Sequence, residues 1–385
     1  TLTEFAPFLT RLMRREAITD VLYFADRLPY HQIAEGVANG LGATPYAVEN
    51  GYLRPDWLTL EPGGMGLFSR FPTAWDHIKA IADGAPQIDP TIQFGHSFAK
   101  EAYFDVSHTL TRVFATGLYP HYERDRAHHP IREYLSWLPQ LVRRQWARSR
   151  ADAKTQKIIA EGKPFFLFPM QLQEDYQIRH NSKYHDFATL VDEIFGSFAR
   201  GAPAGALLLV KIHPLDNGLQ NWRKTLKEAK HVHGLTGRIR LLSAGPLADM
   251  LEHTSGVVLV NSTVGLTALR EARPVKTLGA AVYDIERLTD QQPLDTFWEN
   301  PKAPDPDAVD VFVRALARAT QLKGSFYDPP GMDQGAREIV RRVATGVGGS
   351  SWFVTPPPRL SRAQTLGIEV DEANWPLPRR ARVEA

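Results

Sequence analysis

Two stretches of this 385-residue chain decide its fold. They are Gly256-Val257-Val258-Leu259-Val260-Asn261-Ser262-Thr263-Val264-Gly265 and the earlier Ala206-Leu207-Leu208-Leu209-Val210-Lys211-Ile212-His213-Pro214. In each, a short apolar run typical of a buried strand stops at polar residues, and in the later stretch a helix pattern then begins. Helix-start amides, the hydroxyls of Ser262 and Thr263, and the side chains of Lys211 and His213 can all donate hydrogen bonds to a phosphate. The sequence therefore predicts an α/β protein with a site for a phosphorylated ligand.

Composition narrows the classes of function. The 45 Lys and Arg residues nearly balance the 43 Asp and Glu residues, and a formal net charge of +2 gives no reason to expect nucleic-acid binding. The chain has no cysteine, which excludes disulfides, thiolate metal sites and cysteine nucleophiles and suits a reducing compartment. The sequence shows neither a signal-peptide pattern nor an apolar run of membrane-spanning length. We therefore expect a cytoplasmic protein, soluble or peripheral to a membrane.

The length predicts two domains. Short apolar strands alternate with helices between residues 165 and 278, which is typical of a doubly wound parallel sheet. In the first half we predict a strand at 21–24, a helix at 29–39, a strand at 45–48, a long ordered loop over 50–75, and mostly helices over 97–160. The predicted boundaries are 1–160 for the first domain, 161–325 for the second, and 326–385 for an irregular, Pro-rich tail.

Polar residues follow several of the predicted strands. Glu49 follows a strand of the first domain, and Asp175, Lys211 and Asn261 follow strands of the second. In open parallel sheets, ligands bind outside the carboxyl ends of the strands, so these segments are expected to converge. A single His-Pro or Asn-Ser-Thr segment would be weak evidence. Their combination points to one binding site.

Four motifs occur in order along the chain: Glu49-Asn50-Gly51-Tyr52-Leu53-Arg54-Pro55-Asp56-Trp57, Gln171-Leu172-Gln173-Glu174-Asp175-Tyr176-Gln177-Ile178, Lys211-Ile212-His213-Pro214-Leu215-Asp216 and Asn261-Ser262-Thr263-Val264-Gly265. Further matching segments are Leu278-Gly279-Ala280-Ala281-Val282-Tyr283-Asp284, Leu288-Thr289 and Phe297-Trp298. Together they cover roughly residues 20 to 327 and resemble the KpsS/KpsC family of capsule β-Kdo transferases, in its single-module, KpsS-like form.

The resemblance implies a GT-B fold: an acceptor-side domain and a CMP-sugar-binding domain, both Rossmann-like, with a cleft between them. It implies transfer of Kdo from CMP-Kdo, with retention of configuration, to a phosphatidylglycerol-type lipid during synthesis of the capsule linker. This reaction takes place in the cytoplasm, at the inner membrane. A second Kdo transferase of the KpsC type is a candidate partner. The resemblance also implies that this chain lacks the family's first strand and Gly-containing loop.

The resemblance assigns roles to individual residues. Asp175 matches the carboxylate that is thought to form a covalent Kdo adduct, and Glu49 matches an acidic residue on the acceptor side. The expected donor-binding residues are Gln171, Gln173, Lys211, His213, Asn261, Ser262 and Thr263. This chain departs from the family at two of these motifs. Asn50 stands where a second acidic residue is common, and Glu174-Asp175-Tyr176 replaces a Thr-Asp-Ser type of segment.

The chemistry supports the same assignments by residue type. Cleavage of the bond between a keto sugar and CMP develops positive charge at the anomeric carbon and negative charge on the leaving phosphate. A carboxylate stabilises the first charge, and a cationic pocket rich in hydrogen-bond donors stabilises the second. Retention requires two displacements, hence a nucleophilic carboxylate and a group that activates the acceptor hydroxyl. Asp175 and Glu49 suit these tasks.

Structural interpretations of the same residues stay open at this point. Asp175 could be a helix N-cap, and Glu49 could pair with Arg54 at the surface. His213 could fix a loop from a buried position, and Ser262 and Thr263 would cap a helix in any protein. The scattered histidines lack the spacing of a metal site, so we predict no metal and no cofactor.

A basic stretch around Trp146 suggests contact with a membrane surface. Arg143, Arg144, Arg148 and Arg150 occur within eight positions that contain no acidic residue. Such a run attracts anionic lipid headgroups, although a solvated helix face is the commoner outcome. We therefore assign Arg143, Arg144 and Arg148, with Arg54, to the acceptor or the anionic inner-membrane surface.

Two other functions fit part of the pattern. A CDP-glycerol glycerophosphotransferase also places a Lys-x-His-Pro-like element around a cytidine diphosphate, but it relies on a histidine base, which the Gln-rich segment around Asp175 argues against. A non-catalytic capsule lipid-binding or export factor would need no nucleophile. Consumption of CMP-Kdo by the purified protein separates the three functions.

Overall fold

The computed structural model describes residues 2–95, 98–119, 121, 136, 149–172, 175–216, 218–219, 221–346 and 350–370. The chain divides into two compact units. Unit 1 joins the first 125 residues to Val311–Thr365, and unit 2 comprises residues 126–310 with Leu366–Ile368. The chain therefore leaves unit 1, builds unit 2, and returns.

Unit 2 contains a five-stranded parallel sheet. Its strands are β4 (Phe165–Pro169), β5 (Leu207–Lys211), β6 (Ile239–Leu242), β7 (Gly256–Leu259) and β8 (Val275–Thr277), in the spatial order β6-β5-β4-β7-β8. The residues of β4, β5 and β7 are buried throughout, as a sheet covered on both faces requires. The order reverses between β4 and β7, which makes their carboxyl ends the topological switch point of the unit.

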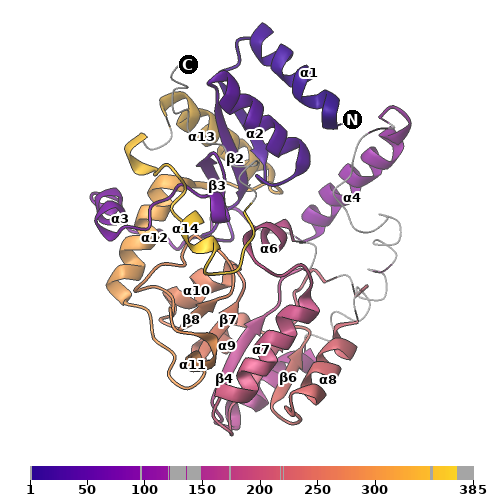
Figure 1. Ribbon diagram of the computed structural model, residues 1–385, viewed down its shortest axis with the longest axis vertical. Coiled ribbons are helices and arrows are strands. Elements are labelled where there is room, and N and C mark those ends of the chain that lie inside the picture. Colours follow the sequence, from indigo (N-terminus) through magenta and orange to yellow (C-terminus); the bar gives the residue numbers. More distant parts are fainter. Residues whose placement is uncertain are drawn as a thin grey trace. The chain divides into compact units, whose positions relative to one another are not determined.

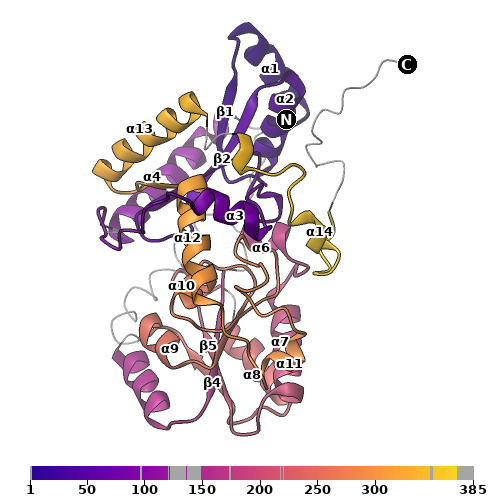
Figure 2. The same ribbon diagram turned by 90° about the vertical axis from the view of Figure 1, so that its left-hand side faces the viewer.

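Helices cover both faces of this sheet. The helices of unit 2 are α6 (Tyr176–Asn181), α7 (Phe187–Gly201), α8 (Trp222–Val232), α9 (Leu247–His253), α10 (Val264–Arg270) and α11 (Leu294–Phe297). Figure 2 shows α7, α8 and α11 on one side of β4 and β5, and α9 on the other. Phe166 and Phe168 of β4 pack against Ile194 and Phe198 of α7 in the main core. The expectation of a doubly wound parallel sheet is confirmed for this unit.

Unit 1 contains a four-stranded mixed sheet. Its strands are β1 (Asp20–Phe24), β2 (Thr44–Asn50), β3 (Trp57–Pro62) and β9 (Gln321–Lys323), in the spatial order β1-β2-β3-β9. β1 pairs with β2 in parallel, and β3 and β9 are antiparallel to their neighbours. The unit is α/β, as predicted, but its Rossmann-like part is the β1–α2–β2 segment.

The helices of unit 1 come from both ends of the chain. They are α1 (Leu2–Arg15), α2 (Pro29–Leu41), α3 (Trp75–Ala82), α4 (Phe98–Phe114), α13 (Pro329–Thr345), α14 (Leu360–Ala363), most of α12 (Pro306–Thr320), and the short turns η1 (Gly66–Phe68), η2 (Ala115–Gly117) and η3 (Ser350–Trp352). One face of the sheet is apolar, where Tyr46, Leu58 and Leu322 pack against Ile339 and Val343 of α13. The opposite face packs against α2 (Figure 1).

Two predictions for this unit need correction. The predicted loop over 50–75 contains β3 and η1, because the alternation along Trp57–Glu61 builds a strand with one apolar and one polar face. The region predicted to be an irregular tail contains α13, whose apolar side covers the sheet, and β9 is the edge strand that precedes it. Residues 311–365 therefore complete unit 1.

Candidate functional site

The carboxyl ends of β4 and β7 are tied together by two amide side chains. Gln171 Nε2 donates to Asn261 Oδ1 at 2.9 Å, and Gln171 Oε1 accepts the backbone N–H of Asn261 at 3.2 Å. Gln171 lies just after β4, and Asn261 just after β7. The two residues that the sequence placed in one donor site therefore meet at the switch point of unit 2.

The amide network extends into α6. Asn261 Nδ2 donates to the carbonyl of Gln177 at 3.0 Å, and Asn181 Nδ2 donates to Gln177 Oε1 at 2.8 Å. The carbonyl of buried Asn181 accepts the backbone N–H of Ala280, after β8, at 2.7 Å. Successive hydrogen bonds thus hold the segments after β4, β7 and β8 in fixed positions, which preorganises this edge of the sheet.

Asp175 begins α6. Its Oδ1 accepts the backbone N–H of Gln177 at 3.0 Å, so the side chain is the N-cap of that helix. The side chain is half-buried. Asp175 is therefore positioned next to Gln177, a member of the amide network, and the helix-capping interpretation describes the interaction it makes in this structure.

Lys211 ends β5, the strand beside β4. It is 9% exposed, and burial alone lowers the pKa of its ammonium group. Among the described residues, no carboxylate forms an ion pair with it. A nearly buried cation without a counter-charge is costly, and an anionic ligand would remove that cost. Among the described residues, Lys211 is therefore a candidate for binding an anion.

His213 lies two residues beyond Lys211, on the same loop. Its Nδ1 accepts the backbone N–H of Leu215 at 3.1 Å, so a neutral ring carries its proton on Nε2. Asp216 fixes the end of the loop by accepting from Trp222 Nε1 at 2.8 Å. His213 is thus held as a donor, which suits a contact to phosphate oxygen.

Ser262 and Thr263 form the turn into α10. Ser262 Oγ accepts the backbone N–H of Val264 at 3.2 Å, and the carbonyl of Ser262 accepts the hydroxyl of Tyr283. Gly265 is required here, because a Cβ at this position would lie 2.3 Å from the Tyr283 hydroxyl oxygen. The buried Tyr283 ring therefore packs against this turn and fixes its position.

Glu49 and Arg54 lie in unit 1. Glu49 is the penultimate residue of β2, opposite Thr59 of β3, and is half-buried. Arg54 is exposed in the turn between these strands. Glu49 is close enough to Tyr52 for its charge to contribute to the raised pKa of that phenol. Glu49 therefore belongs to the polar face of the sheet, inside the strand that was expected to end before it.

Glu61 was not identified from the sequence. It is fully buried on the polar face of β3, where it accepts hydrogen bonds from the Tyr52 hydroxyl at 2.9 Å and from the Ser69 hydroxyl. Burial raises the pKa of Glu61 to about 7. The signal was available in the alternating Thr59-Leu60-Glu61 segment, which the surrounding Gly and Pro residues obscured.

A second buried acidic group in unit 1 was also missed. Arg27 forms a buried ion pair with Glu35 and lies 3.3 Å from Asp26 Oδ2, which also accepts the backbone N–H of Met65 at 2.9 Å. Burial raises the pKa of Glu35 to about 7. Gly64 allows the close approach, since a Cβ there would lie 2.8 Å from Asp26 Oδ2. Unit 1 thus contains several carboxyl groups removed from water.

Some predicted residues lie outside the described part of the chain. These are Gln173, Arg143, Arg144 and Arg148, whereas Arg150 is exposed at the start of the helical residues 149–160. In the part of the chain that the structure describes, no helix is long and apolar enough to span a membrane. The same residues contain no group of three or more His, Cys, Asp or Glu side chains that could hold a metal ion.

Comparison with known proteins identifies the family. A family model described as capsule polysaccharide biosynthesis protein matches residues 19–327. The chain belongs to this family. The capsule polysaccharide export protein KpsS of Escherichia coli is 30% identical over 84% of this chain and 83% of its own length. The capsule polysaccharide modification protein LipB of Neisseria meningitidis serogroup A is 32% identical over 84% of this chain and 78% of its own.

Among solved structures, KpsC β-Kdo 2,7-transferase of Thermosulfurimonas dismutans matches 88% of each chain, at 16% identity and a TM-score of 0.46. The span of the family match agrees with the motifs found between residues 20 and 327, so the resemblance stated from those motifs is confirmed. For this member of the capsule polysaccharide biosynthesis family, the switch point of unit 2 is the candidate site.

Proposed function

We propose that this protein is a retaining β-Kdo glycosyltransferase that takes Kdo from CMP-Kdo during capsule polysaccharide synthesis. The family supports a role in capsule polysaccharide synthesis, and the resemblance of the four sequence motifs to capsule β-Kdo transferases supports the sugar. The observation that carries the proposal is Lys211, a nearly buried cation without a described counter-charge. It ends β5, which pairs with β4, the strand that leads to the Gln171–Asn261 pair at the switch point. That environment suits the phosphate of CMP.

Each residue of the site has a defined task in this proposal. Lys211 stabilises the leaving phosphate, and His213 donates its Nε2–H to it. Gln171 and Asn261 hold the strand ends around the nucleotide, and the turn at Ser262 and Thr263 borders the phosphate. Asp175 attacks the anomeric carbon as the bond to CMP breaks, which forms a Kdo ester and releases CMP. The acceptor hydroxyl then displaces the carboxylate, and Glu49 takes its proton.

The glycerophosphotransferase alternative is disfavoured by His213. That reaction needs a basic imidazole nitrogen facing the acceptor hydroxyl, whereas Nδ1 of His213 is occupied by the Leu215 N–H. No described contact favours it over Kdo transfer. A phosphatidylglycerol-type acceptor, a KpsC-type partner, and a peripheral position on the inner membrane through Arg54, Arg143, Arg144 and Arg148 are further parts of the proposal.

The test is incubation of purified protein with CMP-Kdo and a short-chain phosphatidylglycerol, followed by mass spectrometry of the lipid. We expect a product heavier than the acceptor by one Kdo residue, with release of one CMP and a β-anomeric linkage. CDP-glycerol is offered in parallel. Consumption of CDP-glycerol with CMP-Kdo untouched would replace this proposal by the glycerophosphotransferase. Binding of the lipid without consumption of either nucleotide would identify a lipid-binding factor.

A further inference from the structure

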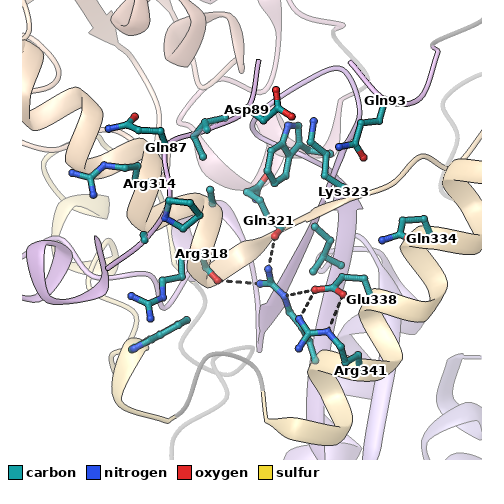
Figure 3. A pocket seen from close by; sticks show the side chains of 18 of the residues that line it. Gln87, Asp89, Gln93, Arg314, Arg318, Gln321, Lys323, Gln334, Glu338 and Arg341 are labelled. Atoms are coloured by element: carbon teal, nitrogen blue, oxygen red, sulfur yellow. Dashed lines mark hydrogen bonds and ion pairs between the residues drawn. The ribbon is translucent and has the colours of Figure 1, made fainter. Parts of the chain in front are cut away.

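Unit 1 contains a cavity that the proposed reaction does not use. Its volume is about 670 Å³, within the range of small-molecule sites. The walls come from α12, α13, η3, the start of β3, the edge strand β9, and the segment 85–93 (Figure 3). Every lining residue that the structure describes belongs to unit 1, so the cavity lies within that unit.

Five of the twenty described residues that line the cavity are cations, and Lys323, Arg341 and Arg342 among them are paired with carboxylates. Lys323 Nζ lies 3.0 Å from both carboxylate oxygens of Asp56 and 4.5 Å from the centre of the Trp57 ring. Arg341 and Arg342 share the carboxylate of Glu338. These ion pairs form part of the cavity wall, but their cations are already neutralised and would attract an anionic ligand only weakly.

Arg318 differs from these neighbours. Its Nη1 donates to the carbonyls of Ile81, at 3.1 Å, and Asp83, at the end of α3, and neither carbonyl cancels its charge. Its guanidinium lies 4.9 Å from the centre of the Trp352 ring, which fixes its plane. No carboxylate of a described residue pairs with it. Because both carbonyl contacts use Nη1, the Nε–Nη2 edge is the fork that can meet an anion.

The other lining residues indicate the kind of molecule to which the anionic group belongs. Gln87 and Gln334 are exposed amides on opposite walls, and Thr345 adds a hydroxyl. Amides donate to and accept from hydroxyl groups. The cavity is also many times larger than a phosphate ion. It therefore suits an anion that carries a hydroxylated carbon chain rather than a bare ion.

We propose that this cavity binds an anionic polyol, whose phosphate or carboxylate is held by the Nε–Nη2 edge of Arg318 and whose hydroxyls contact Gln87 and Gln334. Arg314, one turn earlier on α12, lines the same wall and donates to the carbonyl of Ala82 at 3.1 Å. The proposal stands apart from the donor chemistry of unit 2. It gives the protein a second ligand site.

The test is calorimetry in the presence of saturating CMP, which keeps the proposed donor site filled. The probes are sn-glycerol 3-phosphate, which carries a phosphate, free Kdo, which carries a carboxylate, and glycerol, which is neutral. We expect saturable binding of at least one charged probe and none of glycerol. Arg318→Gln should weaken binding at least tenfold, and Arg318→Lys should restore part of it. Which charged probe binds more tightly tells phosphate from carboxylate.

The matched control is Arg337→Gln. Arg337 lies on α13, pairs with Asp333 at 2.9 Å, and does not line the cavity, so its variant should bind like the parent. Should both Arg318 variants fail to fold, the exposed pair Gln87→Ala and Gln334→Ala should still weaken binding at least threefold. No saturable binding of either charged probe, or equal effects of Arg318→Gln and Arg337→Gln, would overturn the proposal. Failure of CMP itself to bind would instead count against the proposed function.

Discussion

The two units bury charge in opposite ways. In unit 2, the cation Lys211 stands at a strand end, nearly buried and without a described counter-charge. In unit 1, the carboxyl group of Glu61 stands inside a strand, satisfied by the hydroxyls of Tyr52 and Ser69 and with its pKa raised to about 7. A buried cation at a strand end favours the binding of an anion. In Glu61, burial favours the protonated carboxyl group and outweighs the two hydroxyl hydrogen bonds, which favour the ionised form.

The largest expected effect distinguishes a catalytic role of Asp175 from a role in helix capping alone. Asp175 and Asp186 both cap a helix by accepting a backbone N–H, at 3.0 and 2.8 Å. Asparagine is also a good N-cap, so Asp175→Asn and Asp186→Asn should both fold with nearly unchanged stability. Asp175→Asn should lower the rate of Kdo transfer by about a thousandfold or more, because a carboxamide is a poor nucleophile, and Asp186→Asn should not.

Turnover from CMP-Kdo measures this difference, and intact-protein mass spectrometry detects a trapped Kdo ester in the parent. Rates for Asp175→Asn within about tenfold of the parent, a barrier change near 1.4 kcal/mol, would leave Asp175 with capping alone.

The buried acid of unit 1 should make stability depend on pH. The folded pKa of Glu61, about 7, lies above the ordinary 4.5, so the folded state binds more protons between these values. Stability from this group is therefore greatest below pH 4.5 and falls as the pH rises to about 7, by roughly 3 kcal/mol at most. Glu61→Gln keeps the shape of the group without this titration.

Hydrogen exchange of β3 peptides in both proteins at pH 5 and pH 7.5 measures the effect. The parent should lose more protection than Glu61→Gln between the two pH values. Glu35 contributes in the same direction in both proteins, so the comparison isolates Glu61. Parallel pH profiles would show that Glu61 is ionised in the fold.

Lys211→Met should change binding and stability in opposite directions. It should weaken CMP binding by about 2 kcal/mol, the value of a hydrogen bond to a charged group. The unliganded protein should become no less stable, because the change removes a buried cation that no described carboxylate neutralises. Lys154→Met is the control, since its exposed ammonium donates only to the carbonyl of Leu241 among described residues.

The pH dependence adds a second criterion. Only the ammonium form of Lys211 attracts phosphate, so the parent's CMP affinity should fall as the pH rises through a pKa below the ordinary 10.5. Lys211→Met should lack this decline. If calorimetry showed that both proteins bind CMP equally at pH 7, the anion site would not include Lys211 at the end of β5.

Tyr283→Phe should have the smallest effect. The change removes one hydrogen bond to the Ser262 carbonyl, worth about 1 kcal/mol, and keeps the ring against Gly265. We expect a loss of thermal stability of a few degrees and a several-fold weaker affinity for CMP, because the turn loses its support. If Tyr283→Phe bound CMP as tightly as the parent, Ser262 would not be part of the nucleotide site.

The difference between the two units explains which parts of the fold and of the site could be predicted from the sequence. The strands of unit 2 are continuous apolar runs followed by polar residues, and the stretches 206–214 and 256–265 contain β5 and β7, as predicted. Lys211 and Asn261 were selected as donor-site residues because they follow these strands, and Gln171 because of the family resemblance; the structure brings Gln171 and Asn261 into contact. A sheet buried on both faces gives a strong local signal.

The strands and buried acidic residues of unit 1 were harder to predict from the sequence, for physical reasons. Its strand β3 has one polar and one apolar face and lies among Gly and Pro residues, so Glu61 and its two hydroxyl partners were missed. β9 has three residues and depends on pairing with β3, from about 260 positions earlier in the chain, a distance that local patterns do not report. The ion pair between Arg27 and Glu35 likewise exists only once β1 and α2 pack together.

The return of the chain to unit 1 has a consequence for biosynthesis. Every strand of unit 2 has left the ribosome once residue 277 has emerged, so its sheet can be completed while translation continues. Unit 1 still lacks its edge strand β9 and the helix that covers its apolar face, because both follow residue 320. Unit 1, whose first strands are synthesised before unit 2, is thus completed after it, and until then its exposed strand edge depends on protection from pairing with other chains.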